Sequence, residues 1–345
     1  MIITRTPFRI TLGGGGTDLP SFYEQHGGYV FTMAINKYMF ICLNRRSVAD
    51  KKIVIRYSQV ETVDTLGEIK HPLAREALKL HNLDQNLELT SIADMPGKAG
   101  MGSSGSYLVG LLTAIHAHKN EIVSMHAIAE EACHIEMDVL KEPVGKQDQY
   151  IAALGGFQVL EIDKSGRVET RSIPVDFVTA NELATKCRVY YTGVQRSATS
   201  VLKEQDAAAR NATYEKQAGK SEVIETLLAI KDIGRRIEKA FLDRDLDSFA
   251  RLTDEHWQQK CRLSRNISIS SVDELYEVVK KRFGVLGGKI IGAGGGGFVM
   301  LYTPHANRDL DAFMLEHDMP RVSYFPSAQG ARVVSDLTTF DDFSL

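Results

Sequence analysis

The feature that most constrains this chain is a glycine-rich stretch at residues 94–106, which reads Asp-Met-Pro-Gly-Lys-Ala-Gly-Met-Gly-Ser-Ser-Gly-Ser. The alternating residues 87–93 before it predict a strand, and apolar residues at helical spacing over 108–115 predict a helix after it. At such a junction the free N–H groups and positive dipole end of the helix favour a bound anion. Because small residues let a polyphosphate approach the main chain, the stretch predicts a nucleotide-phosphate site.

Composition narrows the class of protein. A chain of 345 residues can form one large or two medium domains, and its net charge of −3 gives no reason to expect nucleic acid or an anionic membrane as a partner. The four cysteines lie far apart without a CxxC pair, which is typical of reduced thiols. No signal-peptide pattern or membrane-length apolar run occurs. We therefore expect a soluble, cytoplasmic protein with a small-molecule partner, and a homodimer is compatible with the sequence.

The order of elements predicts an α+β chain in two parts. The first third is rich in strand patterns, helices follow, and a hairpin is expected near residues 157–173. A long helical stretch over 197–264, with interior breaks near 211–219 and 243–247, comes next, and helices alternate with strands over 272–324. That alternation indicates a layer of helices on an antiparallel sheet. We place the domain boundary so that residues 1–180 form one domain and residues 181–345 the other.

Two further glycine clusters flank the first. Gly13–Gly16 follow a strand, and because four adjacent glycines cost backbone entropy, close approach of a ligand is favoured over a plain turn. Asp18, just after them, either binds hydroxyl groups or caps a short helix at 20–25. The third cluster, Gly292–Gly297, lies between two predicted strands. It is either a tight strand connection or a loop that packs against the ligand from the other domain.

The middle cluster also matches the dinucleotide pattern GxGxxG. That interpretation is disfavoured, because the helix after it leads into another helix and no acidic residue ends a strand about 20 residues later. The pattern GxxxxGK[ST] does not occur, which argues against an ordinary P-loop enzyme. Ser103 and Ser104 either cap the following helix or place a hydroxyl on Mg²⁺ beside the phosphates, and both roles are compatible in one serine.

Taken together and in this order, the three clusters resemble the motifs of the GHMP kinases, the superfamily of galactokinase, homoserine kinase, mevalonate kinase and phosphomevalonate kinase. The similar segments are Arg5–Asp18, Pro96–Gly105 and Gly292–Gly297, so the resemblance spans nearly the whole chain. It implies a two-domain α+β fold, with a ribosomal-protein-S5-like N-terminal domain and a ferredoxin-like C-terminal domain. ATP and Mg²⁺ would lie in the cleft between them.

Within that superfamily the motifs most resemble those of heptose-phosphate kinases, through Leu12–Ser21, Gly145–Tyr150 and Tyr191–Ser197. The resemblance implies transfer of phosphate from ATP to the anomeric hydroxyl of D-glycero-D-manno-heptose 7-phosphate. The product, the 1,7-bisphosphate, leads to nucleotide-activated heptose for capsule or lipopolysaccharide. Two alternatives remain: a fucose-type or other anomeric sugar kinase, and a non-catalytic sensor of ATP and sugar. Gly15-Gly16 stand where galactokinase has Glu-His, which argues against galactose.

The resemblance also implies roles for single residues. Asp148 matches the catalytic aspartate, Arg9 its cationic partner, and Lys146 a neighbour that binds phosphate or tunes the aspartate; Ser104 and Glu136 match the Mg²⁺ ligands. The phosphate-binding residues would be Pro96, Gly97, Lys98, Ala99, Gly100, Met101, Gly102, Ser103, Ser104 and Gly105. The substrate-binding residues would be Gly15, Gly16, Thr17, Asp18, Arg196, Gly294 and Gly295.

Without the resemblance, several of these residues have plainer interpretations. Asp148 could simply begin a helix, Arg9 could face solvent from a strand, and Glu136 is one of several acidic residues on its helix. A substrate with a remote phosphate needs a further cation, for which Arg196 is the main candidate; weaker ones are Lys37, Arg45, Arg46 and Lys203. The ten histidines show no HExxH spacing, and zinc at Cys133-His134-x-Glu136 is disfavoured.

Overall fold

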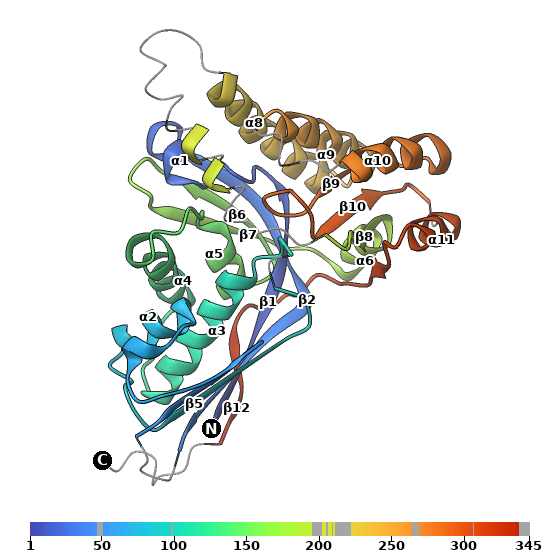
Figure 1. Ribbon diagram of the computed structural model, residues 1–345. Helices are drawn as coiled ribbons and strands as arrows, with labels where there is room; N and C mark the ends of the chain where they lie inside the picture. Colours follow the sequence, from blue (N-terminus) through green and yellow to red (C-terminus); the bar gives the residue numbers. More distant parts are fainter. Residues whose placement is uncertain are drawn as a thin grey trace.

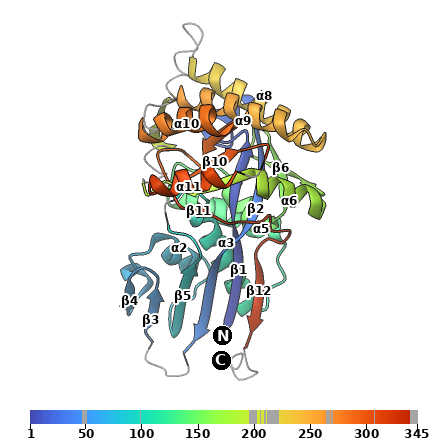
Figure 2. The same cartoon turned by 90° about the vertical axis from the view of Figure 1, so that its right-hand side faces the viewer.

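The structure is a computed structural model that describes residues 1–46, 51–97, 99–194, 202–204, 206–208, 210, 222–263, 267, 270–305 and 307–337. Within these residues, two sheets with their covering helices lie one above the other along an elongated molecule (Figures 1 and 2). The larger sheet has eight strands and the smaller one four. Among the described residues, no helix combines the length and the apolar character needed to cross a bilayer.

The larger sheet is built on two long antiparallel strands, β1 (Ile2–Gly13) and β2 (Gly28–Arg45). Its order is β12-β1-β2-β5-β3-β4, and β6 and β7 extend it from β2. The shorter strands are β3 (Ile53–Arg56), β4 (Val60–Val63), β5 (Leu87–Ala93), β6 (Phe157–Ile162), β7 (Val168–Ile173) and β12 (Arg332–Asp336). Strand β1 continues through Pro7, and the register with β2 shifts between Pro7 and Phe8, where the missing N–H is tolerated.

Helices cover this sheet (Figure 1). They are α1 (Pro20–His26), α2 (Pro72–Leu80), α3 (Ser103–His118), α4 (Met125–Cys133) and α5 (Gln147–Leu154), with a 3₁₀ turn η1 (Leu66–Glu68) and a π-helical segment η2 (His134–Val139) directly after α4. The central helix α3 packs against β1 and β2 and is buried on nearly all sides, as its apolar sequence demands. It therefore carries the residues at its N-terminus on a rigid support.

The smaller sheet has the antiparallel order β11-β8-β10-β9. Its strands are β8 (Cys187–Tyr191), β9 (Gly287–Ile290), β10 (Phe298–Tyr302) and β11 (Arg321–Val322), and its helices are α6 (Phe177–Lys186), α8 (Glu222–Leu242), α9 (Leu246–Cys261), α10 (Ser270–Phe283) and α11 (Arg308–Glu316). Helices α8 and α9 pair with each other, and both also reach β1. The upper end of the long strands is thus shared between the two layers.

The two-domain α+β architecture confirms the expected fold class. The predicted interruption near residues 243–247 is also present, because α8 ends at Leu242 and α9 begins at Leu246. Four elements were not expected from the sequence: β4, η1, α6 and β12. Strand β12 pairs with β1, so the chain returns to the first sheet after completing the second. The division into residues 1–180 and 181–345 stays a prediction. Strand β12 belongs to the second range in sequence but lies in the larger sheet, beside β1.

Helix α8 crosses β1 at a contact between glycines, which gives a test of the packing. A Cβ atom on Gly234 would lie 2.8 Å from the backbone nitrogen of Gly14 and 3.0 Å from its Cα. Since these are backbone atoms, we expect Gly234→Ala to lower the free energy of unfolding by about 1–3 kcal/mol through overpacking. The control Asp232→Ala, on the exposed side of α8, should change it by less than about 0.5 kcal/mol. Urea denaturation measures both, and a stabilised Gly234→Ala, as helix propensity alone favours, would contradict the packing argument.

Candidate active site

A cleft lies where the two layers meet, and all three glycine clusters contribute to its wall. The first cluster supplies the end of β1 and the turn after it, the second supplies the N-terminus of α3, and the third connects β9 to β10. The lining residues are Arg9, Gly16, Asp18, Leu19, Gly100, Gly102, Ser103, Ser104, Val144, Gly145, Gln147, Asp148, Gln149, Leu202, Lys260, Gly292 and Ala293.

The loop before α3 and the β9–β10 loop touch through their backbones. A Cβ atom on Gly292 would lie 2.2 Å from the carbonyl oxygen of Gly100, and one on Gly297 would lie 2.1 Å from that of Ala99. Gly100, Gly292 and Gly297 also have positive φ angles of 78°, 83° and 85°, which suit glycine. The third cluster therefore connects two strands and supports the loop before α3 from the other layer, and its packing against a ligand stays a prediction.

Only the start of the third cluster reaches the cleft. Gly292 and Ala293 line it. Gly295 instead donates its N–H to the carbonyl of Ile267 at 2.7 Å, and a Cβ atom on Gly294 would meet the Ile267 side chain at 2.8 Å. The structure thus places the predicted substrate-binding residues Gly294 and Gly295 against residue 267, one step back from the cleft.

Helix α3 begins at Ser103 with its first turn facing the cleft. Gly102 is the N-cap residue, in the left-handed conformation with φ 77°, and no side chain among the described residues caps the helix there. Ser103 and Ser104 are therefore helical residues that line the cleft, and the capping interpretation of these serines is wrong. Because nothing described caps the first turn, its N–H groups are suited to an anion. Lys98 lies outside the described residues.

A second groove adjoins the same loop on its outer side. Ser103 and Ser104 line both hollows, and Gly97 lines the outer one. The other residues of the outer groove are Met39, Tyr57, Ser58, His71, Leu73, Ser91, Ala93, Met95 and Tyr107. The rings of His71 and Tyr107 stack with their centroids 4.5 Å apart. The loop thus separates an apolar and aromatic groove from the polar cleft.

Arg9 joins three parts of the site. Its Nε donates to Oδ1 of Asp148 at 2.7 Å and its Nη2 donates to Oδ2 at 3.0 Å, while Nη1 donates to the carbonyl of Gly100 at 2.5 Å. Arg9 is 4% exposed, so its charge needs this pairing. The interpretation of Arg9 as a strand residue facing solvent is therefore wrong. A bidentate pair of this kind fixes the direction of the carboxylate as well as its charge.

Glu136 is 2% exposed and lies behind the cleft wall, in contact with the lining residues Gln149 and Ser104. Gln149 donates to its Oε2 at 2.5 Å, and the Ser104 hydroxyl also hydrogen-bonds to it. Burial raises the pKa of Glu136 from 4.5 to about 7, the nearby Asp148 raises it further, and the two hydrogen bonds oppose that rise. The Oε1 of Gln149 is buried and finds no hydrogen-bond partner among the described residues.

This donor set fits a magnesium ion. A buried carboxylate, a hydroxyl and an amide oxygen without a partner are hard oxygen donors of the kind that Mg²⁺ takes, with phosphate and water oxygens completing its shell. The other acidic residues of the same region have different partners: Glu130 binds Lys146, and Glu131 binds two histidines. The three-dimensional arrangement therefore distinguishes Glu136 from its acidic neighbours, as helical register alone could not.

Lys146 is placed differently from expectation. Its ammonium group donates to Glu130 at 2.9 Å and to the carbonyl of Gly166 at 2.8 Å, and it does not line the cleft as the described residues form it. These contacts attach the start of α5 to α4 and to the β6–β7 turn. The structure thus gives Lys146 a positioning role for Asp148 in place of direct contact.

The first glycine cluster is held by Asp18. Its Oδ1 accepts the N–H of Gly16 at 3.1 Å and its Oδ2 accepts the N–H of Gln147 at 3.2 Å, so it connects this cluster to the segment that carries Asp148. Burial and the nearby charge of Asp148 raise the pKa of Asp18. A Cβ atom on Gly145 would lie 2.0 Å from Oδ2 of Asp18, which explains the glycine there.

Of the four predicted substrate-binding residues in this cluster, Gly16 and Asp18 line the cleft. Thr17 is fully buried, and its hydroxyl contacts the carbonyls of Gly14 at 2.8 Å and of Tyr29 at 2.7 Å. Gly15 faces the Thr11 side chain. The structure therefore gives Thr17 the role of closing the turn onto β2.

Lys260 is a charged residue of the cleft that sequence reasoning missed, as it missed Gln149. It lies in α9, is buried, and donates to the carbonyl of Gly292 at 2.5 Å. Burial, and then the neighbouring charge of Arg9, lower the pKa of Lys260 to about 8. A single lysine in an amphipathic helix has no local signal that would identify it.

Arg196, the expected cation for a remote phosphate, lies outside the described residues. None of the weaker candidates Lys37, Arg45, Arg46 and Lys203 lines the cleft as the described part of the chain forms it.

Two family models and several characterised proteins match this sequence. The family description "GHMP kinases N terminal domain" matches residues 69–156, and "GHMP kinases C terminal" matches residues 237–314. The chain is 27% identical over 314 residues to a D-glycero-alpha-D-manno-heptose 7-phosphate kinase of Campylobacter jejuni, covering 88% of this chain and 89% of that protein. It is 24% identical to an L-fucokinase/L-fucose-1-P guanylyltransferase of Bacteroides fragilis, covering 86% of this chain and 34% of that longer protein.

Solved structures agree in fold. A D-glycero-D-manno-heptose 1-phosphate kinase from Bacteroides thetaiotaomicron superposes with a TM-score of 0.76 at 20% identity, covering 98% of this chain and 100% of that one. A Lactococcus lactis galactokinase in complex with galactose gives a TM-score of 0.75 at 20% identity, covering 96% and 94%. The two-domain architecture is therefore the one that these sugar kinases share.

The raised pKa of Glu136 predicts a dependence of stability on pH. Its pKa of about 7 in the folded chain exceeds the ordinary 4.5, so the folded state holds this proton more tightly than the unfolded state. The proton on Glu136 therefore adds about 3 kcal/mol to the free energy of unfolding below pH 4.5, and this contribution is lost as the pH rises through 7. Without divalent cations, Glu136→Gln should match the unsubstituted protein near pH 4.5 and become more stable by roughly that amount at pH 8.

Urea denaturation across this pH range measures the difference. The control Asp138→Asn, whose side chain is 65% exposed in the same π-helical segment, should keep the pH dependence of the unsubstituted protein. A Glu136→Gln variant with the same pH dependence as the unsubstituted protein would contradict the assignment.

Proposed function

This chain belongs to the GHMP kinases, and we propose that it transfers the γ-phosphoryl group of ATP to the anomeric hydroxyl of D-glycero-D-manno-heptose 7-phosphate. The product is the 1,7-bisphosphate, a precursor of nucleotide-activated heptose for capsule or lipopolysaccharide. Because ATP and sugar phosphates are cytoplasmic metabolites and all four cysteines are free thiols, we place the protein in the cytoplasm.

One observation carries this proposal: the Arg9–Asp148 pair lies beside the uncapped N-terminus of α3. Phosphoryl transfer needs an oriented hydroxyl, a held phosphate chain and neutralised charge. Asp148 would accept or orient the proton of the sugar hydroxyl, and Arg9 would keep that carboxylate ionised and stabilise charge on the transferred group. Asp148 and the first turn of α3 are close, since a Cβ atom on Gly102 would lie 3.2 Å from the Asp148 carboxyl.

The nucleotide is expected to lie across the loop before α3. Its phosphates would take the N–H groups of residues 100–105, and its base would enter the outer groove beside Tyr107 and Met95. Ser104, Glu136 and Gln149 would hold Mg²⁺, which supplies neutralising charge to the phosphates when it is bound. Glu136, buried with a raised pKa in the chain alone, would become ionised next to that cation.

The choice of sugar rests on two supports. The Campylobacter jejuni relative, a heptose 7-phosphate kinase, aligns over nearly the full length of both chains. The cleft wall at residue 16 is glycine, so no side chain projects there to restrict a large sugar. Gly16 and Asp18 would contact the sugar ring, and Arg196 would bind the remote phosphate.

Two alternatives to the heptose 7-phosphate kinase can be distinguished from it by experiment. A fucose-type kinase is supported by the resemblance to the Bacteroides fragilis fucokinase. A sensor without turnover is less well supported, because Arg9, Ser104, Glu136 and Asp148 all meet around one cleft, and binding alone does not need every one of them.

A substrate panel tests the proposed reaction. With ATP and Mg²⁺, we expect turnover of D-glycero-D-manno-heptose 7-phosphate and a new anomeric phosphate signal in the ³¹P NMR spectrum of the product. Fucose, mannose and galactose at equal concentration should be poor substrates. Faster turnover of a sugar without phosphate would reject the heptose assignment, and binding of ATP with no product from any sugar would favour the sensor.

Asp148 is tested separately. Asp148→Asn preserves an acceptor for Arg9 but removes the carboxylate, so we expect kcat to fall by roughly 10²–10⁴-fold while the KM for ATP changes little. Steady-state kinetics measure both, and circular dichroism checks the fold. The control Asp84→Asn, at an exposed position outside the cleft, should keep full activity. An Asp148→Asn enzyme with undiminished kcat would show that another group handles the proton.

A further inference from the structure

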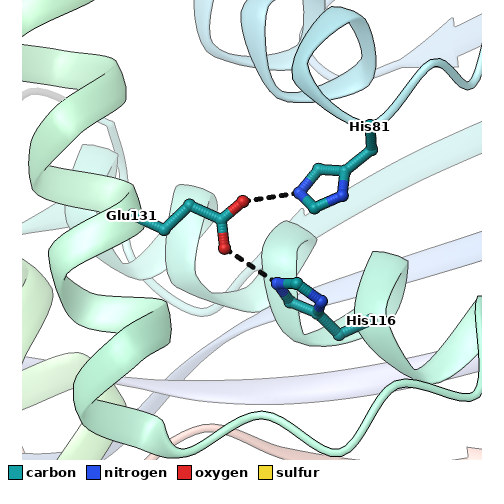
Figure 3. Close-up of side chains that lie close together, drawn as sticks. All are labelled: His81, His116 and Glu131. Atoms are coloured by element: carbon teal, nitrogen blue, oxygen red, sulfur yellow. Dashed lines mark hydrogen bonds and ion pairs between the residues drawn. The ribbon is translucent and has the colours of Figure 1, made fainter.

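Three helices bring two histidines and a glutamate together far from the cleft. His81 directly follows α2, His116 lies in the last turn of α3, and Glu131 lies in α4 (Figure 3). The two carboxylate oxygens of Glu131 point to one imidazole each: His81 Nε2 lies 2.6 Å from Oε1, and His116 Nε2 lies 2.8 Å from Oε2. One ligand atom from each residue can be chosen so that all lie within 4.8 Å of one another.

A neutral His116 ring cannot donate a hydrogen bond to both of the carboxylates that it faces. Its Nδ1 faces Glu121 at 2.7 Å, while its Nε2 faces Glu131. Ionised carboxylates only accept hydrogen bonds, and a neutral imidazole carries a single N–H. If that N–H points to Glu121, the lone pair of Nε2 points at a carboxylate. Either the ring carries a second proton, or a cation lies between Nε2 and Glu131.

We propose that His81, His116 and Glu131 form a binding site for a transition-metal dication such as Zn²⁺, separate from the Mg²⁺–nucleotide site. Two imidazole nitrogens and one carboxylate are a common zinc donor set, which leaves a fourth position for water. Imidazole ligands favour Zn²⁺, Ni²⁺ or Cu²⁺ over Mg²⁺. Glu121 accepts the Nδ1 proton of His116 and thereby turns its Nε2 lone pair toward the site, as supporting carboxylates do around zinc.

The present distances require only a small adjustment. Ligands about 2.0–2.1 Å from a tetrahedral ion lie about 3.3 Å apart, so the N···O separations of 2.6 and 2.8 Å would open by roughly half an ångström. The wider separations among the three ligand atoms, which reach up to 4.8 Å, would close by up to about 1.5 Å. The three side chains are 8%, 11% and 19% exposed, so the ion would be shielded yet reachable from solvent.

The site is remote from the chemistry but mechanically connected to it. Ser104 and His116 lie at opposite ends of α3, about 18 Å apart along the helix axis. An ion held here would fasten the ends of α2 and α3 to α4, and so hold the helix whose other end faces the cleft. We therefore expect the ion to affect stability and not the chemical step.

The test uses the full chain without nucleotide, stripped of metal with a chelator and dialysed against Zn²⁺. We expect close to one equivalent of bound Zn²⁺ and a rise in Tm of about 3–5 °C at saturation. His81→Gln and His116→Gln should each lose the bound metal and the rise in Tm. His126→Gln, a histidine of α4 that contacts Thr170 and Tyr150 and no member of the proposed site, should keep both, and so should Glu136→Gln.

A second measurement does not depend on stability. Co²⁺ in place of Zn²⁺ should give visible d–d absorption in the unsubstituted protein and in His126→Gln, and lose it in His81→Gln. Substoichiometric Zn²⁺ in the unsubstituted protein, or full binding by both ligand variants, would overturn the proposal. A third result would also overturn it: Zn²⁺ leaves the Tm of the unsubstituted protein unchanged, and His116→Gln lowers Tm by the same amount with and without Zn²⁺. That result would mean that His116 carries two protons and forms ion pairs with Glu121 and Glu131.

Discussion

The site depends on the buried guanidinium of Arg9. A buried charge is costly unless it is paired and hydrogen-bonded, and here the two-pronged bond to Asp148 and the bond to the Gly100 carbonyl supply that pairing. The same three bonds join β1, α5 and the loop before α3. The distance between the carboxylate and the first turn of α3 is therefore set by one buried side chain on β1. Rigid placement of this kind is what positional catalysis of phosphoryl transfer requires.

A second constraint is the absence of side chains where the layers touch. Gly292 and Gly297 rest on the carbonyls of Gly100 and Ala99, and Gly13 rests on Gly234. Backbone atoms cannot rotate away as side chains can, so each contact fixes one layer against the other at the wall of the cleft. The three glycine clusters thus serve two purposes. They let the two domains approach each other closely enough to form one cleft, and under the proposed function they would let a ligand approach the main chain.

The sequence predicted those parts of the structure whose signals are local. The strand, glycine loop and helix around residues 94–106 follow from alternation and helical spacing, and the break before Leu246 follows from the loss of periodicity. Long-range features had no such signal. Strand β12 pairs with β1, although the two strands lie at opposite ends of the chain. Lys260 lines the cleft from a helix that carries no motif. Lys146 donates to Glu130, a partner that only tertiary packing brings close. The histidine pair escaped notice because residues 81 and 116 meet only through the packing of separate helices.

The charges of the cleft are arranged for an occupant. In the chain alone, burial raises the pKa of Glu136 to about 7 and lowers that of Lys260 to about 8, so both groups approach neutrality near physiological pH. A cation beside Glu136 restores its negative charge and releases a proton, whereas an anion beside Lys260 restores its positive charge and takes one up. We expect the two proton changes to oppose each other when the metal and its polyphosphate arrive together. The binding of that pair would then depend on pH less steeply than the binding of either ion alone.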